Sequence, residues 1–212
     1  MKILSPKIVF LMLLLMSDLL CKQIEILEGG NISLKPDWKE NVNNVKEITW
    51  TLNSNKVAEW NINGKVTFFN QFKDRTQLNT ETGEMNIFGV QLKDGGTYRC
   101  ELIDDNGVIF PREIAVHVHS RLGAPKITCI PNDTAVMLLC NASSSEPIIY
   151  NWNFQPCTAN SDDCELENNN QTITIRNANS HISHQVYCTI NNSLHSNRSE
   201  SVLIRNCIKP GE

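Results

Sequence analysis

The chain lacks a basic excess and, beyond its first residues, any long apolar run. Lysine and arginine total 19 against 23 aspartates and glutamates, for a formal charge of −4. Nucleic acid and acidic membrane surfaces attract basic stripes, so the charge argues against both partners. No stretch of about 20 apolar residues and no lipid-anchor tail follows the N-terminal segment. For a complete reading frame, we expect a mature protein that is free in solution, monomeric and not inserted into a membrane.

Sequence signatures of catalysis are also missing. There is no Gly-X-Ser-X-Gly motif, phosphate-binding loop or His-Glu-X-X-His motif. His117 and His119 lie two residues apart, but no third metal ligand is near them, so we interpret them as ordinary strand-end residues. His181 and His184 are expected to face solvent in a loop. We therefore predict a non-enzymatic protein without catalytic residues, cofactor or metal.

The N-terminus is the most apolar segment of the chain. Lys2 and Lys7 precede the apolar run 8–16, which Ser17 and Asp18 interrupt before it is long enough to span a bilayer. A basic start, a short apolar core and small residues near a cleavage point are typical of a secretory signal. We predict that residues 1–21 are removed and that the protein is secreted.

Cysteine is absent from residue 22 to residue 99 and then becomes dense. Seven cysteines remain after the predicted signal, and such a density is typical of an oxidising compartment. Asn-X-Ser/Thr sequons, the acceptors of N-linked glycans, also suit a secreted glycoprotein. The sequons begin at Asn31, Asn132, Asn141, Asn170, Asn191 and Asn197, so five of the six lie in the second half of the chain.

The segment 22–119 has the pattern of an all-β domain. Short β-type runs are broken by turn dipeptides such as Asn63-Gly64 and Asn106-Gly107. No apolar repeat with the helical period persists over a dozen residues. The segment 94–100 matches the immunoglobulin pattern Asp-X-Gly-X-Tyr-X-Cys, in which the tyrosine hydroxyl bonds upstream backbone. We predict an immunoglobulin-like sandwich.

Six core positions specify a variable-type sandwich without its disulfide. Trp50 occupies the core tryptophan position, and Tyr98 that of the tyrosine corner. Arg75 is placed to pair with Asp94 across the bottom of the sandwich. The usual cysteine partner on the second strand is replaced by Leu34, so Cys100 has no partner in its domain. It is either a free thiol packed in the core or the site of an intermolecular disulfide.

A second domain is predicted at 124–208, after a linker, 120–125, that contains glycine and proline. Cys140, Trp152 and Cys188 follow the cysteine, tryptophan, cysteine order of an immunoglobulin sandwich. The short distance from this tryptophan to the next predicted strand leaves no room for additional strands. The sequence therefore predicts a constant-type domain.

The six cysteines of this domain allow fifteen pairings, and their spacing alone does not choose among them. The expected fold narrows the choice to Cys140 with Cys188 between the sheets, Cys129 with Cys207 at the domain edge, and Cys157 with Cys164 across a short loop. By loop-closure entropy, the long bridges would contribute roughly 4 kcal/mol each and the short one about 2.5 kcal/mol.

This combination resembles the signalling lymphocyte activation molecule (SLAM) family. The resemblance rests on Leu34 in place of a cysteine, on segments 48–50, 57–60 and 72–75, and on the cysteines of the second domain. It covers nearly the whole mature chain and is strongest to the lipid-anchored ligand of that family, whose counter-receptor lies on natural killer cells and other lymphocytes. Cys100 and the missing anchor signal depart from that ligand's pattern.

The missing anchor bears on the role that the resemblance implies. Soluble, cytomegalovirus-encoded copies of the family's ligand are known as decoys, and the chain is similar to one. The resemblance thus implies a soluble mimic that occupies a SLAM-family receptor, blocks its normal ligand and serves immune evasion. An adhesion ligand whose anchor is missing from the sequence and a binder of a cytokine or other soluble factor remain open. The residues do not distinguish a host from a viral origin.

Family members bind through the exposed face of the front sheet of the first domain. If Trp50, Tyr98 and Cys100 point inward, their strand neighbours point outward. The receptor-binding residues predicted in this way, with the adjoining turn and strand, are Glu47, Thr49, Thr51, Glu59, Arg99, Glu101, Ile103, Asp104, Asp105, Asn106, Phe110 and Arg112. The resulting face is acidic. Asn31 belongs to the other sheet, so glycans would leave the face bare.

Overall fold

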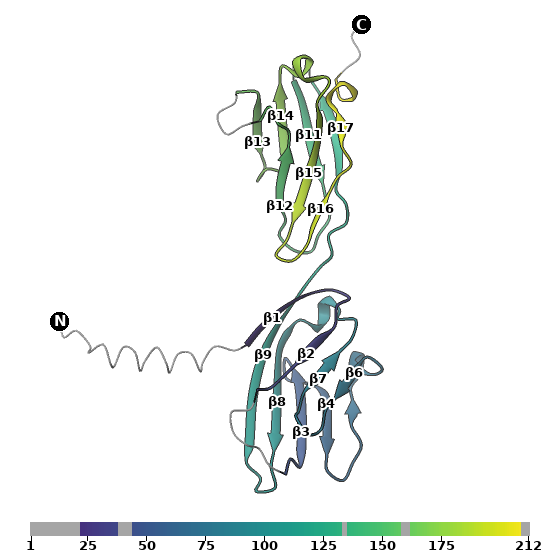
Figure 1. Cartoon of the computed structure of the whole chain (residues 1–212), viewed down its shortest axis with the longest axis vertical. Helices are drawn as coiled ribbons and strands as arrows, with labels where there is room; N and C mark the ends of the chain where they lie inside the picture. Colours follow the sequence, from purple (N-terminus) through teal and green to yellow (C-terminus); the bar gives the residue numbers. More distant parts are fainter. Residues whose placement is uncertain (1–21, 38–43, 133–134, 158–161, 209–212) are drawn as a thin grey trace, which may run out of the picture. The chain divides into compact units, whose positions relative to one another are not determined.

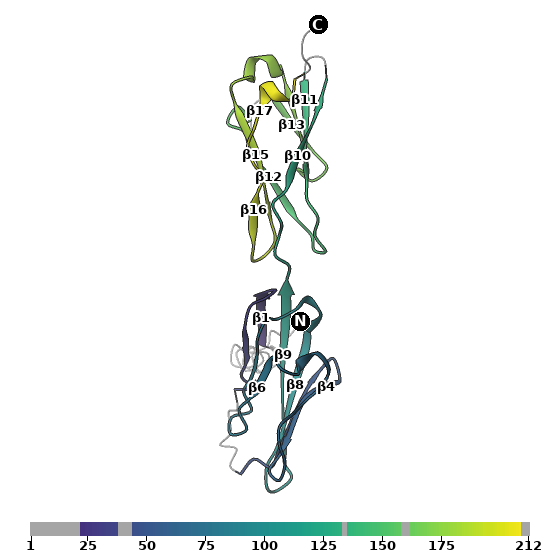
Figure 2. The same ribbon diagram turned by 90° about the vertical axis from the view of Figure 1, so that its right-hand side faces the viewer.

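The computed structural model describes residues 22–37, 44–132, 135–157 and 162–208. The predicted signal segment therefore lies outside the described residues. Contacts divide the chain into two compact units, 1–118 and 119–212, each of which forms a β-sandwich (Figures 1 and 2). No helix in the described ranges is long and apolar enough to span a membrane.

The first unit packs a six-stranded front sheet against a three-stranded sheet (Figure 1). In spatial order, the front sheet contains β1 (Lys22–Leu27), β9 (Ile109–His119), β8 (Gly96–Ile103), β3 (Glu47–Leu52), β4 (Asn55–Asn61) and β5 (Thr67–Phe68). The smaller sheet contains β2 (Ile32–Leu34), β7 (Met85–Ile87) and β6 (Thr76–Leu78). Short 3-10 helices at Asn70–Phe72 and Leu92–Asp94 complete the unit.

Alternating burial along the strands builds one apolar core between the two sheets. Along β8, Tyr98, Cys100 and Leu102 are buried, whereas Arg99 and Glu101 are not. This period of two follows from strand geometry, because successive side chains point to opposite faces. The strand β3 alternates in the same way. The prediction of an all-β domain is confirmed.

The immunoglobulin signature residues take their predicted places. The Tyr98 hydroxyl donates to the carbonyl oxygen of Asp94 at 2.8 Å, and burial raises the pKa of this phenol, which stays a donor. The buried Asp94 carboxylate lies 2.7 Å from Nη2 of Arg75. Trp50 is fully buried and donates its indole N–H to the carbonyl of Gly83 at 2.9 Å.

Cys100 is a buried free thiol. It lies opposite Trp50 in the register of β8 and β3, and Leu34 of β2 is equally buried at the position of the missing cysteine. Burial, and secondarily the Glu101 carboxylate, raises the pKa of the thiol far above its ordinary value. A neutral, enclosed thiol supports the packing interpretation over an intermolecular disulfide.

The second unit has two sheets. The first contains, in spatial order, β10 (Lys126–Pro131), β11 (Ala135–Asn141), β14 (Thr172–Arg176) and β13 (Cys164–Glu167). The other contains β12 (Ile149–Asn153), β15 (Gln185–Asn191) and β16 (Ser196–Arg198), and β17 (Val202–Leu203) also pairs with β15. Short 3-10 helices lie at Ala178–His181 and Ile204–Asn206.

The three predicted disulfides of the second unit are confirmed. They join Cys140 to Cys188, Cys129 to Cys207, and Cys157 to Cys164. The first of these connects β11 to β15 and lies fully buried in the core. Trp152 packs against this part of the core while remaining partly exposed, and its indole N–H donates to the carbonyl of Asn170 at 2.8 Å.

The segment 120–125, expected as a linker, packs as part of the second unit, whose boundary falls at His119. Leu122 is only 3% exposed and lies beside the buried disulfide of β11 and β15. Its N–H donates to Nδ1 of His195 at 3.1 Å, and its carbonyl accepts from Nδ2 of Asn197 at 3.0 Å. These bonds attach the segment to the turn and strand that follow β15.

The prediction that His181 and His184 face solvent is wrong. Their ring centroids lie 5.5 Å apart, and both rings pack edge-on against Phe154. The side chain of His181 is only 13% exposed. The loop containing them is folded against the core through Phe154, a contact for which their sequence spacing holds no signal.

Candidate receptor-binding face

The outward side of the front sheet, called the front face below, presents three cross-strand rows. The pairing register places Ile109, Ile103, Glu47 and Asn61 in the first row, Pro111, Glu101, Thr49, Glu59 and Thr67 in the second, and Glu113, Arg99, Thr51 and Lys56 in the third. The outward placement predicted for Glu47, Thr49, Thr51, Glu59, Arg99, Glu101 and Ile103 is therefore confirmed. The alternation of side chains along each strand was enough to predict this placement, because the inward residues of β3 and β8 were identified correctly.

Charged side chains on the front face pair with one another. Arg99 lies between two carboxylates, with Nη2 2.7 Å from Oε1 of Glu101 and Nη1 3.9 Å from Oε1 of Glu113. Nζ of Lys56 lies 2.5 Å from Oε2 of Glu59. The face stays acidic, because its carboxylates outnumber its two cations, but less so than the sequence indicated. Exposed pairs of this kind contribute little to stability, so a partner's charges can replace them.

One end of the front face is apolar. Ile109 is 55% exposed and Val108 is 48% exposed, next to the turn that joins β8 to β9. Ile62, 51% exposed, follows β4 at the same end of the sheet, but its N–H donates to the carbonyl of Lys46, one residue beyond the outward row of Glu47 and Asn61, so the register does not place it on the front face. Apolar surface beside charged rows is typical of a protein-binding patch. The sequence interpretation had not included Ile62, Val108 or Ile109.

The turn between β8 and β9 uses two predicted receptor contacts for its own structure. Oδ1 of Asp104 accepts from the backbone N–H groups of Asn106 and Val108, each at 2.9 Å. The hydrogen bond from Val108 is the main cause that lowers the pKa of this exposed carboxyl. Oδ2 of Asp105 accepts from Nδ2 of Asn44 at 3.0 Å. These carboxylates lie at the rim of the face and shape the turn.

The predicted placement of Phe110 and Arg112 on the front face is wrong. They pair with Leu102 and Cys100, which are core residues, and Phe110 itself packs against the core. The error comes from the turn: a two-residue turn centred on 106–107 would pair Phe110 with an outward residue. A one-residue change of register exchanges the two faces of a strand.

The observed turn is one residue longer than that. The N–H of Asp104 donates to the carbonyl of Val108, which leaves three residues between them, and Gly107 has a φ of +75°. Three-residue hairpin loops commonly end with a residue in this left-handed region, usually glycine. Asn106-Gly107 is compatible with either length, so Ile109, Pro111 and Glu113, the true outward residues, were missed.

The predicted glycosylation sites lie away from the front face. Asn31 immediately precedes β2 of the smaller sheet, and the remaining sequons belong to the second unit. None of the six asparagines is on β3, β4, β8 or β9. Modification at any of them would leave these strands accessible.

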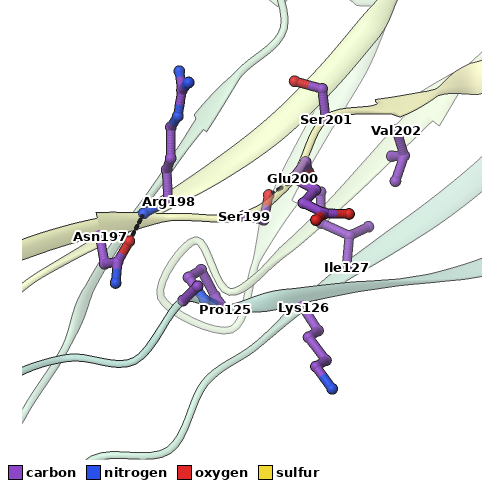
Figure 3. Close-up of a pocket in the computed structure, with 10 residues that line it drawn as sticks. Pro125, Lys126, Ile127, Asn197, Arg198, Ser199, Glu200, Ser201 and Val202 are labelled. Atoms are coloured by element: carbon purple, nitrogen blue, oxygen red, sulfur yellow. Dashed lines mark hydrogen bonds between the residues drawn. The ribbon is translucent and has the colours of Figure 1, made fainter.

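A groove of about 710 Å³ lies within the second unit, between the start of β10 and the stretch from β16 to β17. Figure 3 shows residues that line this groove, among them Lys126, Arg198 and Glu200, with Glu200 beside Ile127 in this view. Its lining contains no histidine or cysteine. Across the described ranges, no cluster of three or more histidine, cysteine, aspartate or glutamate side chains is placed to hold a metal. The front face is therefore a stronger candidate for the binding site than this groove.

The family model described as immunoglobulin V-set domain matches residues 22–119. Human lymphocyte function-associated antigen 3 is 25% identical over 171 residues, which cover 77% of this chain and 62% of that protein. Human CD48 antigen is 26% identical over 132 residues, which cover 60% of this chain and 54% of that protein. The chain thus spans less than two thirds of the length of these relatives.

Solved structures show the same fold. The CD2-binding domain of CD58 has a TM-score of 0.57 at 18% identity, covering 91% of this chain and 100% of that one. Murine CEACAM1b has a TM-score of 0.62 at 20% identity, covering 84% of this chain and 94% of that one. The V-set match and the relatives support the immunoglobulin superfamily and a relationship to CD58, CD48 and SLAM family members.

Proposed function

We propose that the protein is a ligand for a SLAM-family receptor on natural killer cells or other lymphocytes, and that it binds through the front face. The observation that carries this proposal is the composition of that face: paired charges, an adjoining apolar end and no sequon on its central strands. The relatives support the class of partner, since one of them is a CD2-binding domain.

Binding would exchange the ion pairs of the face for pairs with the partner. Arg99 contacts both Glu101 and Glu113, so a cation of the receptor can take over one carboxylate while the arginine keeps the other. Charge complementarity of this kind mainly sets association rate and partner choice. Ile109, which lies on the front face and is 55% exposed, supplies apolar area that the partner can bury.

Charge reversal tests the face. We expect Glu101→Lys to weaken binding to a SLAM-family ectodomain by about tenfold or more, measured by surface plasmon resonance, with thermal unfolding unchanged. Glu167→Lys is the matched control, because Glu167 is an exposed strand glutamate in the second unit. Asp104 is left intact because its carboxylate builds the turn. Unchanged affinity of Glu101→Lys would contradict the face, and binding only to cytokines in the same screen would contradict the partner.

We further propose that the protein is secreted and acts as a decoy, a soluble mimic that occupies the receptor and blocks its normal ligand. The predicted signal, the three disulfides and the constant-type assignment of the second unit support this role. Expression of the full chain in mammalian cells should release a protein that begins near Lys22, as read by N-terminal sequencing. Recovery only in the membrane fraction would favour the adhesion-ligand alternative.

A further inference from the structure

The second unit exposes an aliphatic side chain on an open sheet edge. The strand β12 is the outer strand of its sheet and pairs only with β15 among the described strands. Its neighbours Tyr150 and Trp152 pack inward against the core, so Ile149 points outward, where it is 64% exposed. An open edge of this kind is a template for pairing with another chain.

Asn191 lies directly opposite Ile149 in the register of β12 and β15. Directly opposed residues of an antiparallel pair hold their Cβ atoms about 4.5–5.5 Å apart on one face of the sheet. Asn191 also begins the sequon Asn191-Asn192-Ser193. A group attached to the amide of Asn191 therefore starts beside the exposed isoleucine.

The side-chain amide of Asn191 is available for modification. Within the described residues this side chain takes part in no hydrogen bond. Other sequon amides are engaged: Nδ2 of Asn141 donates to Oγ1 of Thr128 at 2.8 Å, and Nδ2 of Asn197 donates to the carbonyl of Leu122 at 3.0 Å. A substituent on Asn191 displaces no contact of the fold.

The surroundings of Ile149 on this face are polar. The outward residues next to it are Asn151 on β12, Thr189 on β15 and Ser196, which pairs with Asn191 from β16. A single hydrophilic group at Asn191 thus suffices to cover the one aliphatic side chain among these neighbours.

We propose that an N-linked oligosaccharide on Asn191 covers Ile149 and prevents edge-to-edge pairing of β12 between molecules. In the transfer, Nδ2 of Asn191 bonds to the anomeric carbon of an oligosaccharide carried on a lipid diphosphate, and the sugar–phosphate C–O bond breaks. The lipid diphosphate leaves with the electron pair, and one amide proton passes to a base. This inference rests on the secretion proposed above, because N-glycosylation is a modification of secreted proteins.

The variant Ser193→Ala tests the inference, because it removes the sequon and keeps Asn191. The full chain, secreted from mammalian cells, is expected to carry a glycan at Asn191 by glycopeptide mass spectrometry and to sediment as a monomer. The variant should self-associate on the order of tenfold more tightly, since burial of one isoleucine is worth that much. Ser143→Ala, which removes the sequon at Asn141 through another exposed serine, should leave the association unchanged.

Adding Ile149→Lys to Ser193→Ala should restore the monomer, because a charge on an edge strand opposes pairing. An unmodified Asn191 in the secreted wild type would overturn the inference, and so would a monomeric Ser193→Ala. Receptor affinity of the same samples separates the two proposals. Failure of the glycosylated wild type to bind any SLAM-family ectodomain would contradict the proposed function and leave the glycan assignment standing.

Discussion

The two units of this protein hold the same kind of sandwich together by different means. The second unit has three disulfides, and its tryptophan, Trp152, stays partly exposed. The first unit has none, and Leu34, Trp50 and Cys100 fill its centre with no exposed surface. Covalent loops restrict the unfolded chain, whereas packing stabilises the folded one. The comparison shows that the inter-sheet disulfide is dispensable where an aliphatic side chain and a thiol fill its space.

The corner before the last long strand differs as well. In the first unit, Tyr98, Asp94 and Arg75 form a hydrogen-bonded group at the base of the sandwich. In the second unit, the position two residues before Cys188 is Val186, which is fully buried. Hydrogen bonds and an ion pair thus stabilise this corner in the first unit, whereas an apolar side chain next to a disulfide occupies it in the second unit.

Reduction should have the largest effect and should separate the units. Because the two long bridges contribute roughly 4 kcal/mol each, their loss is comparable to the whole stability of a small domain. We expect reductant to abolish hydrogen-exchange protection in strands β10 to β17 and to spare β1 to β9. The double variant Cys140→Ala/Cys188→Ala should show part of the same loss. Equal loss of protection in both units would contradict the comparison.

Breaking the buried ion pair is the matching change in the first unit. Asp94→Ala removes a carboxylate with no exposed surface and leaves Arg75 unpaired, so we expect a loss of about 3–5 kcal/mol in the unfolding free energy of this unit. The hydrogen-exchange protection of strands β1 to β9 in increasing urea measures it. Glu167→Ala, a surface change in the second unit, is the control. A loss below about 1 kcal/mol would show that the pair does not close the sandwich.

Substitution of Cys100 should have a smaller effect that depends on polarity. Cys100→Ser places a hydroxyl in an apolar site and should cost about 1–3 kcal/mol, whereas Cys100→Val keeps the site apolar and should cost less than about 1.5 kcal/mol. The raised thiol pKa and complete burial also predict that iodoacetamide labels Cys100 only after unfolding. Rapid labelling of the native protein would contradict the enclosed thiol.

Lowering the pH should have the smallest effect. We expect it to weaken the β8–β9 turn of the first unit and to leave the β15–β16 turn of the second unit unchanged. Asp104 caps the β8–β9 turn, while Asn192, which has no ionisable group, accepts from the N–H of Leu194 in the β15–β16 turn. The folded pKa of Asp104 is lowered. Its stabilisation is therefore complete above the unfolded value of about 3.9 and is lost as the pH falls through the folded pKa.

Amide exchange at Val108 and Leu194 measures this difference. Protection at Val108 should fall in acid while protection at Leu194 stays, and Asp104→Asn should remove the pH dependence at Val108. Parallel loss at both amides would indicate general unfolding and contradict a turn-specific effect.

Much of the fold and part of the candidate site could be predicted from the sequence. Trp50 and Tyr98 are recognisable core residues, and they show which side chains of β3 and β8 point inward. Their neighbours Thr49 and Glu101 then point outward, because side chains alternate along a strand whatever the rest of the fold does. The pairing of the cysteines followed once the fold was assumed. The register of β9 did not follow, because it depends on the backbone of a turn whose dipeptide suits two loop lengths.

The sequence by itself determined the two sandwiches, the tyrosine corner, the ion pair and the cysteines available for bridging, since each is a matter of residue type at a characteristic spacing. Tertiary structure alone decided that Ile109 replaces Phe110 on the front face, that Asp104 serves the turn, that Leu122 belongs to the second core, and that Asn191 faces Ile149. These are contacts between residues distant in sequence or set by backbone conformation. Their geometry exists only once the strands have paired.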